Sequence, residues 1–119
     1  MNSEVKFINL TPHEVTIYDD HGNIKLRIPP SGVVARVQTR SIIIGEIEGV
    51  PLRITEYGDI TDLPDPQPNT IYIVSSILLI ALKTKGIVRN DVVAPDTNPD
   101  SVIRDSQGRI IGVKYFQVV

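Results

Sequence analysis

One apolar run constrains the fold of this chain more than any other feature. Residues 77–82 read ILLIAL, and they follow two serines and precede a lysine-containing segment that ends at Gly86. Leucine and alanine dominate the run, which favours a helix over the buried strand that six apolar residues could also form. Ser75 or Ser76 can cap the first turn, and Gly86 supplies the left-handed residue that ends many helices. We therefore predict one main, largely buried helix near residues 75–86.

Short alternating segments on both sides of this run predict strands. Residues 24–28 alternate isoleucine and leucine with lysine and arginine, and a Gly-Asn turn precedes them, so they pair with residues 14–18 as a hairpin. Residues 102–113 predict a second hairpin. Further strands are expected at residues 5–10, 33–39, 41–47, 52–55 and 71–74.

Two segments are predicted to lack regular structure. Residues 58–70 contain three prolines, each of which fixes φ and removes a backbone donor, so we expect a stiff surface loop. Residues 89–100 are polar and follow no period, so we expect a second loop behind the helix. The chain as a whole, residues 1–119, is predicted to be a single α+β domain. It would contain an antiparallel β-sheet of roughly six to eight strands with one main buried helix.

The three isoleucines at residues 42–44 carry a separate expectation. They are apolar on both faces of their strand, which is typical of a strand that is covered on both sides. One helix covers only one side of a sheet. We therefore expect a second copy of the chain to cover the other side in a homo-oligomer.

The composition excludes several classes of protein. A net charge of −2 argues against binding of long nucleic acid, which usually requires a basic excess. The absence of cysteine excludes disulfides, thiol catalysis and the usual ligands of structural zinc. The longest apolar run is too short to cross a bilayer, and no signal peptide is apparent at the N-terminus. We expect a cytoplasmic protein without a membrane partner, and nothing in the sequence indicates a cofactor.

Histidines and carboxylates give little support to catalysis. His13 and His21 lack the partner three or four residues away that a helical metal site would show, so structural or solvated roles are favoured. Asp62 and Asp65 bracket a proline, and aspartate and proline are ordinary residues of surface turns. We predict no catalytic residues and no metal site.

The second half of the chain carries polar groups suited to a nucleotide. Ribose hydroxyls exchange hydrogen bonds with carboxylates and asparagine, and a pyrophosphate suits the fixed fork of an arginine. No glycine-rich phosphate loop occurs, so a phosphate site would have to be built from side chains. The candidate ligand-binding residues are Arg36, Arg89, Asn90, Asp91, Asp96, Thr97, Arg104 and Arg109.

Landmarks along nearly the whole chain resemble a known family. They are NLTPHEV at residues 9–15, PPSGVVARV at 29–37, LPDP at 63–66, TIYIVS at 70–75, VIRD at 102–105 and GRIIG at 108–112. Together they resemble the first-described Thoeris anti-defence family. Members of that family are phage-encoded sponges that sequester cyclic ADP-ribose signals without cleaving them.

The resemblance implies an α+β fold that assembles into symmetric oligomers, with ligand pockets at subunit contacts. It implies a non-enzymatic function: capture of cyclic ADP-ribose or a related cyclic nucleotide or oligonucleotide in the host bacterial cell, which inhibits anti-phage defence. The positions carried over from the motifs are Arg36, Asn90, Asp91, Arg104 and Arg109.

Two alternative functions remain open at this point. A small nucleotide-processing enzyme could use Asp96, Asp100 or His13, and product formation from a labelled nucleotide would identify it. A structural phage protein could use the strand around residues 42–44 to pair with neighbours in a large assembly, and particle size in solution would identify it.

Overall fold

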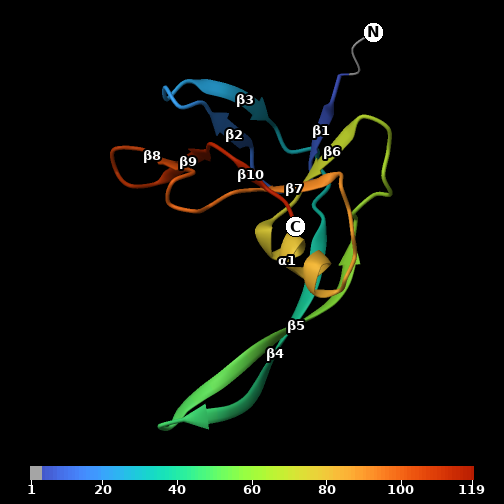
Figure 1. Cartoon of the computed structure of the whole chain (residues 1–119), viewed down its shortest axis with the longest axis vertical. Helices are drawn as coiled ribbons and strands as arrows, with labels where there is room; N and C mark the ends of the chain where they lie inside the picture. Colours follow the sequence, from blue (N-terminus) through green and yellow to red (C-terminus); the bar gives the residue numbers. More distant parts are fainter. Residues whose placement is uncertain (1–3) are drawn as a thin grey trace.

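The structure is a computed structural model that describes residues 4–119, and it is mostly β with one short helix (Figure 1). In chain order the elements are β1 (Lys6–Asn9), β2 (Val15–Tyr18), β3 (Ile24–Ile28), β4 (Arg36–Ile47), β5 (Val50–Thr61), β6 (Thr70–Ile73), α1 (Ser76–Thr84), β7 (Val92–Pro95), β8 (Val102–Arg104), β9 (Ile110–Val113) and β10 (Phe116–Gln117). Of the predicted α+β architecture, the coarse part is confirmed: strands predominate, and the main helix lies within residues 75–86.

The expectation of one purely antiparallel sheet is wrong, because the described strands form three sheets with both parallel and antiparallel pairs. The sheet that carries the core has the order β1-β6-β7-β10, and its first three strands are parallel. The cause is α1, which connects β6 to β7, because a strand–helix–strand crossover returns the chain in the same direction. Strand β7 lies inside the segment that was expected to be a loop. Its residues Val92, Val93 and Ala94 are buried, and such a short strand shows no alternation that would reveal it.

The second sheet joins the two predicted hairpins, which are both confirmed. Its order is β3-β2-β9-β8, and the hairpins meet through a parallel contact of Ile17 with Val113. Gly112 permits that contact. A Cβ atom added there would lie 2.5 Å from the Tyr18 ring and 2.7 Å from the Thr16 carbonyl oxygen. Glycine is therefore required where β9 runs beside β2.

Helix α1 begins and ends as its sequence predicts. The Ser75 hydroxyl accepts from the Leu78 amide at 3.4 Å, and Gly86 adopts a φ of +70° just after the helix. One face buries Leu78 and Leu82 in a core with Tyr72 of β6. The opposite face is exposed, so the helix is buried on one side only. That exposed face carries Ile77 and Ile80.

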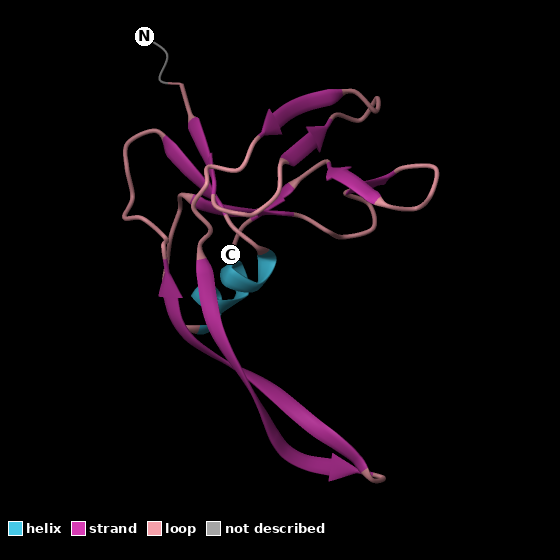
Figure 2. Cartoon of the chain, turned by 180° about the vertical axis from the view of Figure 1, so that it is seen from behind, coloured by secondary structure: helices cyan, strands magenta, loops and turns pink. Residues whose placement is uncertain are grey.

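Strands β4 and β5 form a twisted ribbon, here called the arm, that projects from the rest of the molecule (Figures 1 and 2). The arm replaces the two separate strands expected at residues 33–39 and 41–47, because β4 continues through both, with a register shift between Val37 and Thr39. Strand β5 also extends into the segment expected to be a proline-rich loop. The radius of gyration is 16.8 Å, against about 13.5 Å for a compact domain of this length. The arm therefore lies largely outside the core.

The arm leaves its isoleucines uncovered by the chain itself. Ile43 and Ile44 are 61% and 59% exposed. The pairing of Ile42 with Ile54, and of Ile47 with Val50, places these four side chains on one face of the ribbon, whereas Ile43 pairs with Arg53 on the other face. Residues 42–44 were predicted to be covered on both faces, and within one copy of the described chain they are not. The expected second copy stays a prediction.

Candidate functional site

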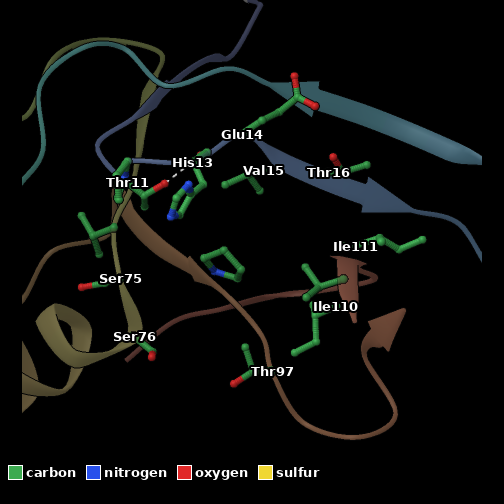
Figure 3. A pocket seen from close by; sticks show the side chains of 15 residues that line it. Thr11, His13, Glu14, Val15, Thr16, Ser75, Ser76, Thr97, Ile110 and Ile111 are labelled. Atoms are coloured by element: carbon green, nitrogen blue, oxygen red, sulfur yellow. Dashed lines mark hydrogen bonds between the residues drawn. The ribbon is translucent and has the colours of Figure 1, made fainter. Parts of the chain in front are cut away.

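A cavity of about 380 Å³ lies where the three parallel strands end (Figure 3). Residues 11–14 follow β1, residues 74–76 follow β6, and Thr97 follows β7, and all of them line it. The remaining wall comes from β2, β9 and Pro95, the last residue of β7. Ligands of open parallel sheets bind outside the carboxyl ends of the strands, so the fold places this cavity where a ligand site is expected.

Asn9 fixes the loop that forms one side of the cavity. Its buried side-chain amide donates to the carbonyls of His13 at 2.8 Å and Ile28 at 3.0 Å. Its Oδ1 accepts from the Thr11 amide at 2.9 Å and from the Thr11 hydroxyl at 2.7 Å. One buried residue therefore determines how Thr11 and His13 face the cavity.

Serines and an aspartate fix the other loops. Ser75 caps α1, and the buried Ser101 accepts from the Lys114 and Tyr115 amides at 3.3 and 3.2 Å. Asp96 Oδ1 accepts from both the backbone and the side chain of Asn98, at 3.1 and 2.7 Å. Asp96 thus shapes the turn beyond Thr97.

The titratable groups at the cavity are few. His13 and Glu14 are the two among its lining residues, and Figure 3 shows the His13 ring pointing into the cavity while Glu14 points away. Within residues 4–119, no hydrogen bond joins the His13 ring to a hydroxyl, and no group of three or more His, Cys, Asp or Glu side chains could hold a metal ion. The lining offers hydroxyls and apolar surface for binding.

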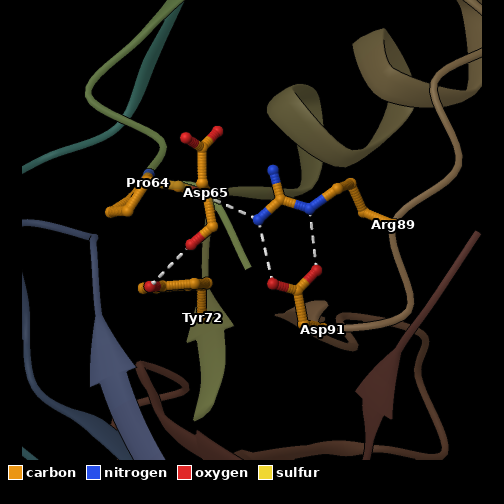
Figure 4. Close-up of polar contacts among 5 residues, drawn as sticks. All are labelled: Pro64, Asp65, Tyr72, Arg89 and Asp91. Atoms are coloured by element: carbon orange, nitrogen blue, oxygen red, sulfur yellow. Dashed lines mark hydrogen bonds and ion pairs between the residues drawn. The ribbon is translucent and has the colours of Figure 1, made fainter. Parts of the chain in front are cut away.

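Arg89 and Asp91 form an ion pair away from the cavity (Figure 4). Arg89 donates from Nε and Nη2 to the two Asp91 carboxylate oxygens at 2.8 and 2.9 Å, and from Nη2 to the Pro64 carbonyl at 2.8 Å. Both side chains are only 14% exposed. The hydrogen bond from Arg89 lowers the pKa of Asp91, and the same bond raises the pKa of Arg89. In addition the Tyr72 hydroxyl donates to the Asp65 carbonyl at 3.2 Å, so these residues tie the proline-rich loop to the sheet.

Arg104 and Arg109 lie in the β8–β9 hairpin. Arg104 donates from Nη1 to the Gly108 carbonyl at 2.7 Å, and Arg109 donates from Nε to Asp105 Oδ2 at 3.0 Å. Hydrogen bonds from the Arg109 and Gln107 amides lower the pKa of Asp105. The Arg109 side chain is 73% exposed, so most of its donors face solvent.

The structure separates the predicted ligand-binding residues into several places. Of the eight, all of which are described, Thr97 lines the cavity at the strand ends. Arg36 lies at the base of the arm beside a smaller hollow, and Asn90 lies behind the end of α1. The local partners given above engage the remaining five, which are Arg89, Asp91, Asp96, Arg104 and Arg109.

Sequence reasoning missed most of the cavity. Thr11, His13, Ser75, Ser76 and Ile110 line it but were not among the predicted residues. For Thr11, His13, Ser75 and Ser76 the available indication was their position shortly after strands. It becomes informative only once β6 and β7 are known to be parallel.

Comparisons with known proteins add no family assignment: no protein-family model, no curated protein and no solved structure matches this chain. Among the described residues, no helix has the length and apolar character needed to cross a membrane.

Proposed function

We propose that this protein binds and sequesters cyclic ADP-ribose or a related cyclic nucleotide without converting it, and thereby inhibits bacterial anti-phage defence. The observation that carries the proposal is the cavity at the carboxyl ends of β1, β6 and β7. Its volume of about 380 Å³ falls within the range of small-molecule sites, about 300–1,000 Å³. The identity of the ligand follows from the family resemblance of the sequence landmarks.

Binding is favoured over reaction by the chemistry of the lining. A hydroxyl nucleophile needs an adjacent base within hydrogen-bond reach. The Ser75 hydroxyl is engaged in the helix cap, and the His13 ring makes no hydrogen bond to a lining hydroxyl in the described chain. Asp96, which a nucleotide-processing enzyme could have used, is engaged by Asn98.

Assembly is the second part of the proposal. The apolar face of the arm supports a homo-oligomer in which a second copy covers it. The same face is the observation that favours the alternative, a structural protein of a large assembly. A small closed oligomer fits a sequestering protein, whereas large particles would fit a structural one.

The test is calorimetric titration with cyclic ADP-ribose, followed by mass spectrometry of the ligand recovered from denatured protein. We expect saturable binding and recovery of intact ligand. Ile110→Glu should abolish binding, because it places a carboxylate beside the cavity. Ile80→Glu is the matched control, since Ile80 on α1 is 51% exposed, against 52% for Ile110, and does not line the cavity. Recovery of a hydrolysed product would overturn the proposal in favour of an enzyme.

A further inference from the structure

We propose that the cavity accepts the uncharged nucleoside part of a nucleotide, so that free nucleosides such as adenosine are themselves ligands of this protein. This inference rests on the proposed function and assigns the part of the ligand that enters the cavity. The phosphates would remain outside, at the β8–β9 hairpin.

The charges around the cavity argue against a buried phosphate. No lysine or arginine is among its lining residues, and the Glu14 carboxylate points away from it (Figure 3). A phosphate taken from water into such a site would lose its hydration without gaining a permanent cation. The Leu78 amide at the start of α1 already donates to the Ser75 hydroxyl, so this donor is not free for an anion. The side chains that line the cavity therefore favour a neutral group.

The lining matches a nucleoside in its two kinds of surface. Val15, Pro95 and Ile110 provide apolar surface for the faces of a planar base. Thr97 and the His13 ring provide groups that exchange hydrogen bonds with ribose hydroxyls, and the Thr11 hydroxyl, which donates to Asn9, can accept one. The cavity volume of about 380 Å³ is near the lower end of the usual range for small-molecule sites. It therefore favours a nucleoside over a complete ring as large as a cyclic dinucleotide.

Cations for the phosphates lie in the β8–β9 hairpin, whose strand β9 forms part of the cavity wall. Arg109 directly precedes Ile110, a lining residue, and commits only its Nε to Asp105. Arg104 lies in the same hairpin and commits its Nη1 to the Gly108 carbonyl. Arg104 and Arg109 together carry two positive charges and Asp105 carries one negative charge, so the hairpin cluster has a net charge of +1. Their remaining guanidinium donors can form charge-assisted hydrogen bonds to phosphate oxygens.

Calorimetric titrations on the full chain test this division. Adenosine, cyclic ADP-ribose and inorganic pyrophosphate are titrated separately into the wild type, Ile110→Ala and Arg109→Gln, and adenosine is then used as a competitor of cyclic ADP-ribose. We expect adenosine to bind and to compete, and pyrophosphate not to compete. Ile110→Ala should weaken adenosine and cyclic ADP-ribose alike, by about fivefold, because it removes part of the apolar wall. Arg109→Gln should weaken cyclic ADP-ribose by about tenfold or more and leave adenosine unchanged. Melting curves of the two variants should match the wild type, since both side chains are exposed.

The outcomes separate this inference from the proposed function. If cyclic ADP-ribose binds but adenosine does not compete, or Ile110→Ala has no effect on either ligand, the inference is overturned and the proposed function stands. If adenosine binds and cyclic ADP-ribose does not, the nucleoside site stands and the proposed function fails. If neither binds, both are overturned.

Discussion

Single buried polar residues determine the shape of the loops around the cavity. Asn9 alone makes four hydrogen bonds that fix the segment after β1, and Ser101 fixes the end of β9 through two amides. Leaving a buried donor or acceptor without its partner costs about 1–3 kcal/mol, so such residues specify one loop conformation. The Arg89–Asp91 pair does the same for the proline-rich loop.

The Arg89–Asp91 pair should make stability depend on pH in the acid range. The folded pKa of Asp91 lies below its unfolded value of about 3.9, so its contribution is present above that value and is lost as pH falls through the folded pKa. Asp91→Asn should lower the free energy of unfolding by about 1.5–3 kcal/mol at pH 7. The difference from wild type should shrink below about pH 4.

Urea unfolding at several pH values measures this effect. Glu56→Gln is the control, because the Arg40–Glu56 pair is on the surface and should contribute about 0–1 kcal/mol. A difference for Asp91→Asn that stayed constant down to pH 2 would show that the charge of Asp91 is unimportant.

At the scale of elements, the contact of β9 with β2 holds the cavity wall in place. The wall residue Ile110 belongs to β9, and β9 reaches its position only because Gly112 lies against Tyr18 and Thr16. The close approach of the second hairpin to β2 therefore requires glycine at residue 112, and the buried Val113 packs with Val15 and Ile17 in the same contact.

Gly112→Ala should destabilise the fold by about 1–3 kcal/mol, because the added methyl group overlaps a backbone carbonyl that cannot move away easily. Gly58→Ala is the comparison, since its new methyl would meet the Gln38 side chain at a milder 3.2 Å. Thermal melting of both variants measures the contrast. Equal melting temperatures for Gly112→Ala and the wild type would mean that β9 does not approach β2 so closely.

The elements with strong local signals could be predicted from the sequence, and those without could not. Helix α1 has a cap, a leucine-rich run and a glycine stop, and the β2–β3 hairpin has alternation and a turn. Strand β7 has neither, because its residues are buried on both faces and its partners are distant in the chain. Because β7 was not predicted, neither the parallel sheet nor the cavity at the ends of its strands could be predicted. Thr97 was found because polar residues gather behind β7, whereas the arginines chosen by type do not line the cavity.

At the scale of the whole molecule, the arm is the part whose apolar face is not covered by the rest of the described chain. A two-stranded ribbon is marginally stable in water by itself, and this one projects from the core with an apolar face that includes Ile42, Ile54 and Leu52. The helix covers only the base of the arm, through contacts of α1 with β4 and β5.

We expect the wild type to be oligomeric at micromolar concentration. Ile54→Lys should raise the dissociation constant at least about 100-fold, because burying an isoleucine contributes about 1.5–3 kcal/mol and the lysine adds a charge to the contact. Thr55→Lys carries the same change on the opposite face of the ribbon and should leave assembly intact. Sedimentation velocity of the three proteins measures this, and a monomeric wild type would refute it.

The outer edges of the arm bear on how large such an assembly can become. Both strands expose unpaired backbone groups along their edges, and exposed strand edges can recruit further copies into open-ended fibres. Pro51 in β5 supplies no N–H, and charged side chains recur along both strands, including Arg40, Glu46 and Arg53. These features disfavour the pairing of one arm's edge with the edge of another copy. Two arms that stack through their apolar faces, by contrast, cover each other and leave no such face for a further copy. The arm therefore favours a closed assembly over an open-ended fibre in the oligomer that we predict.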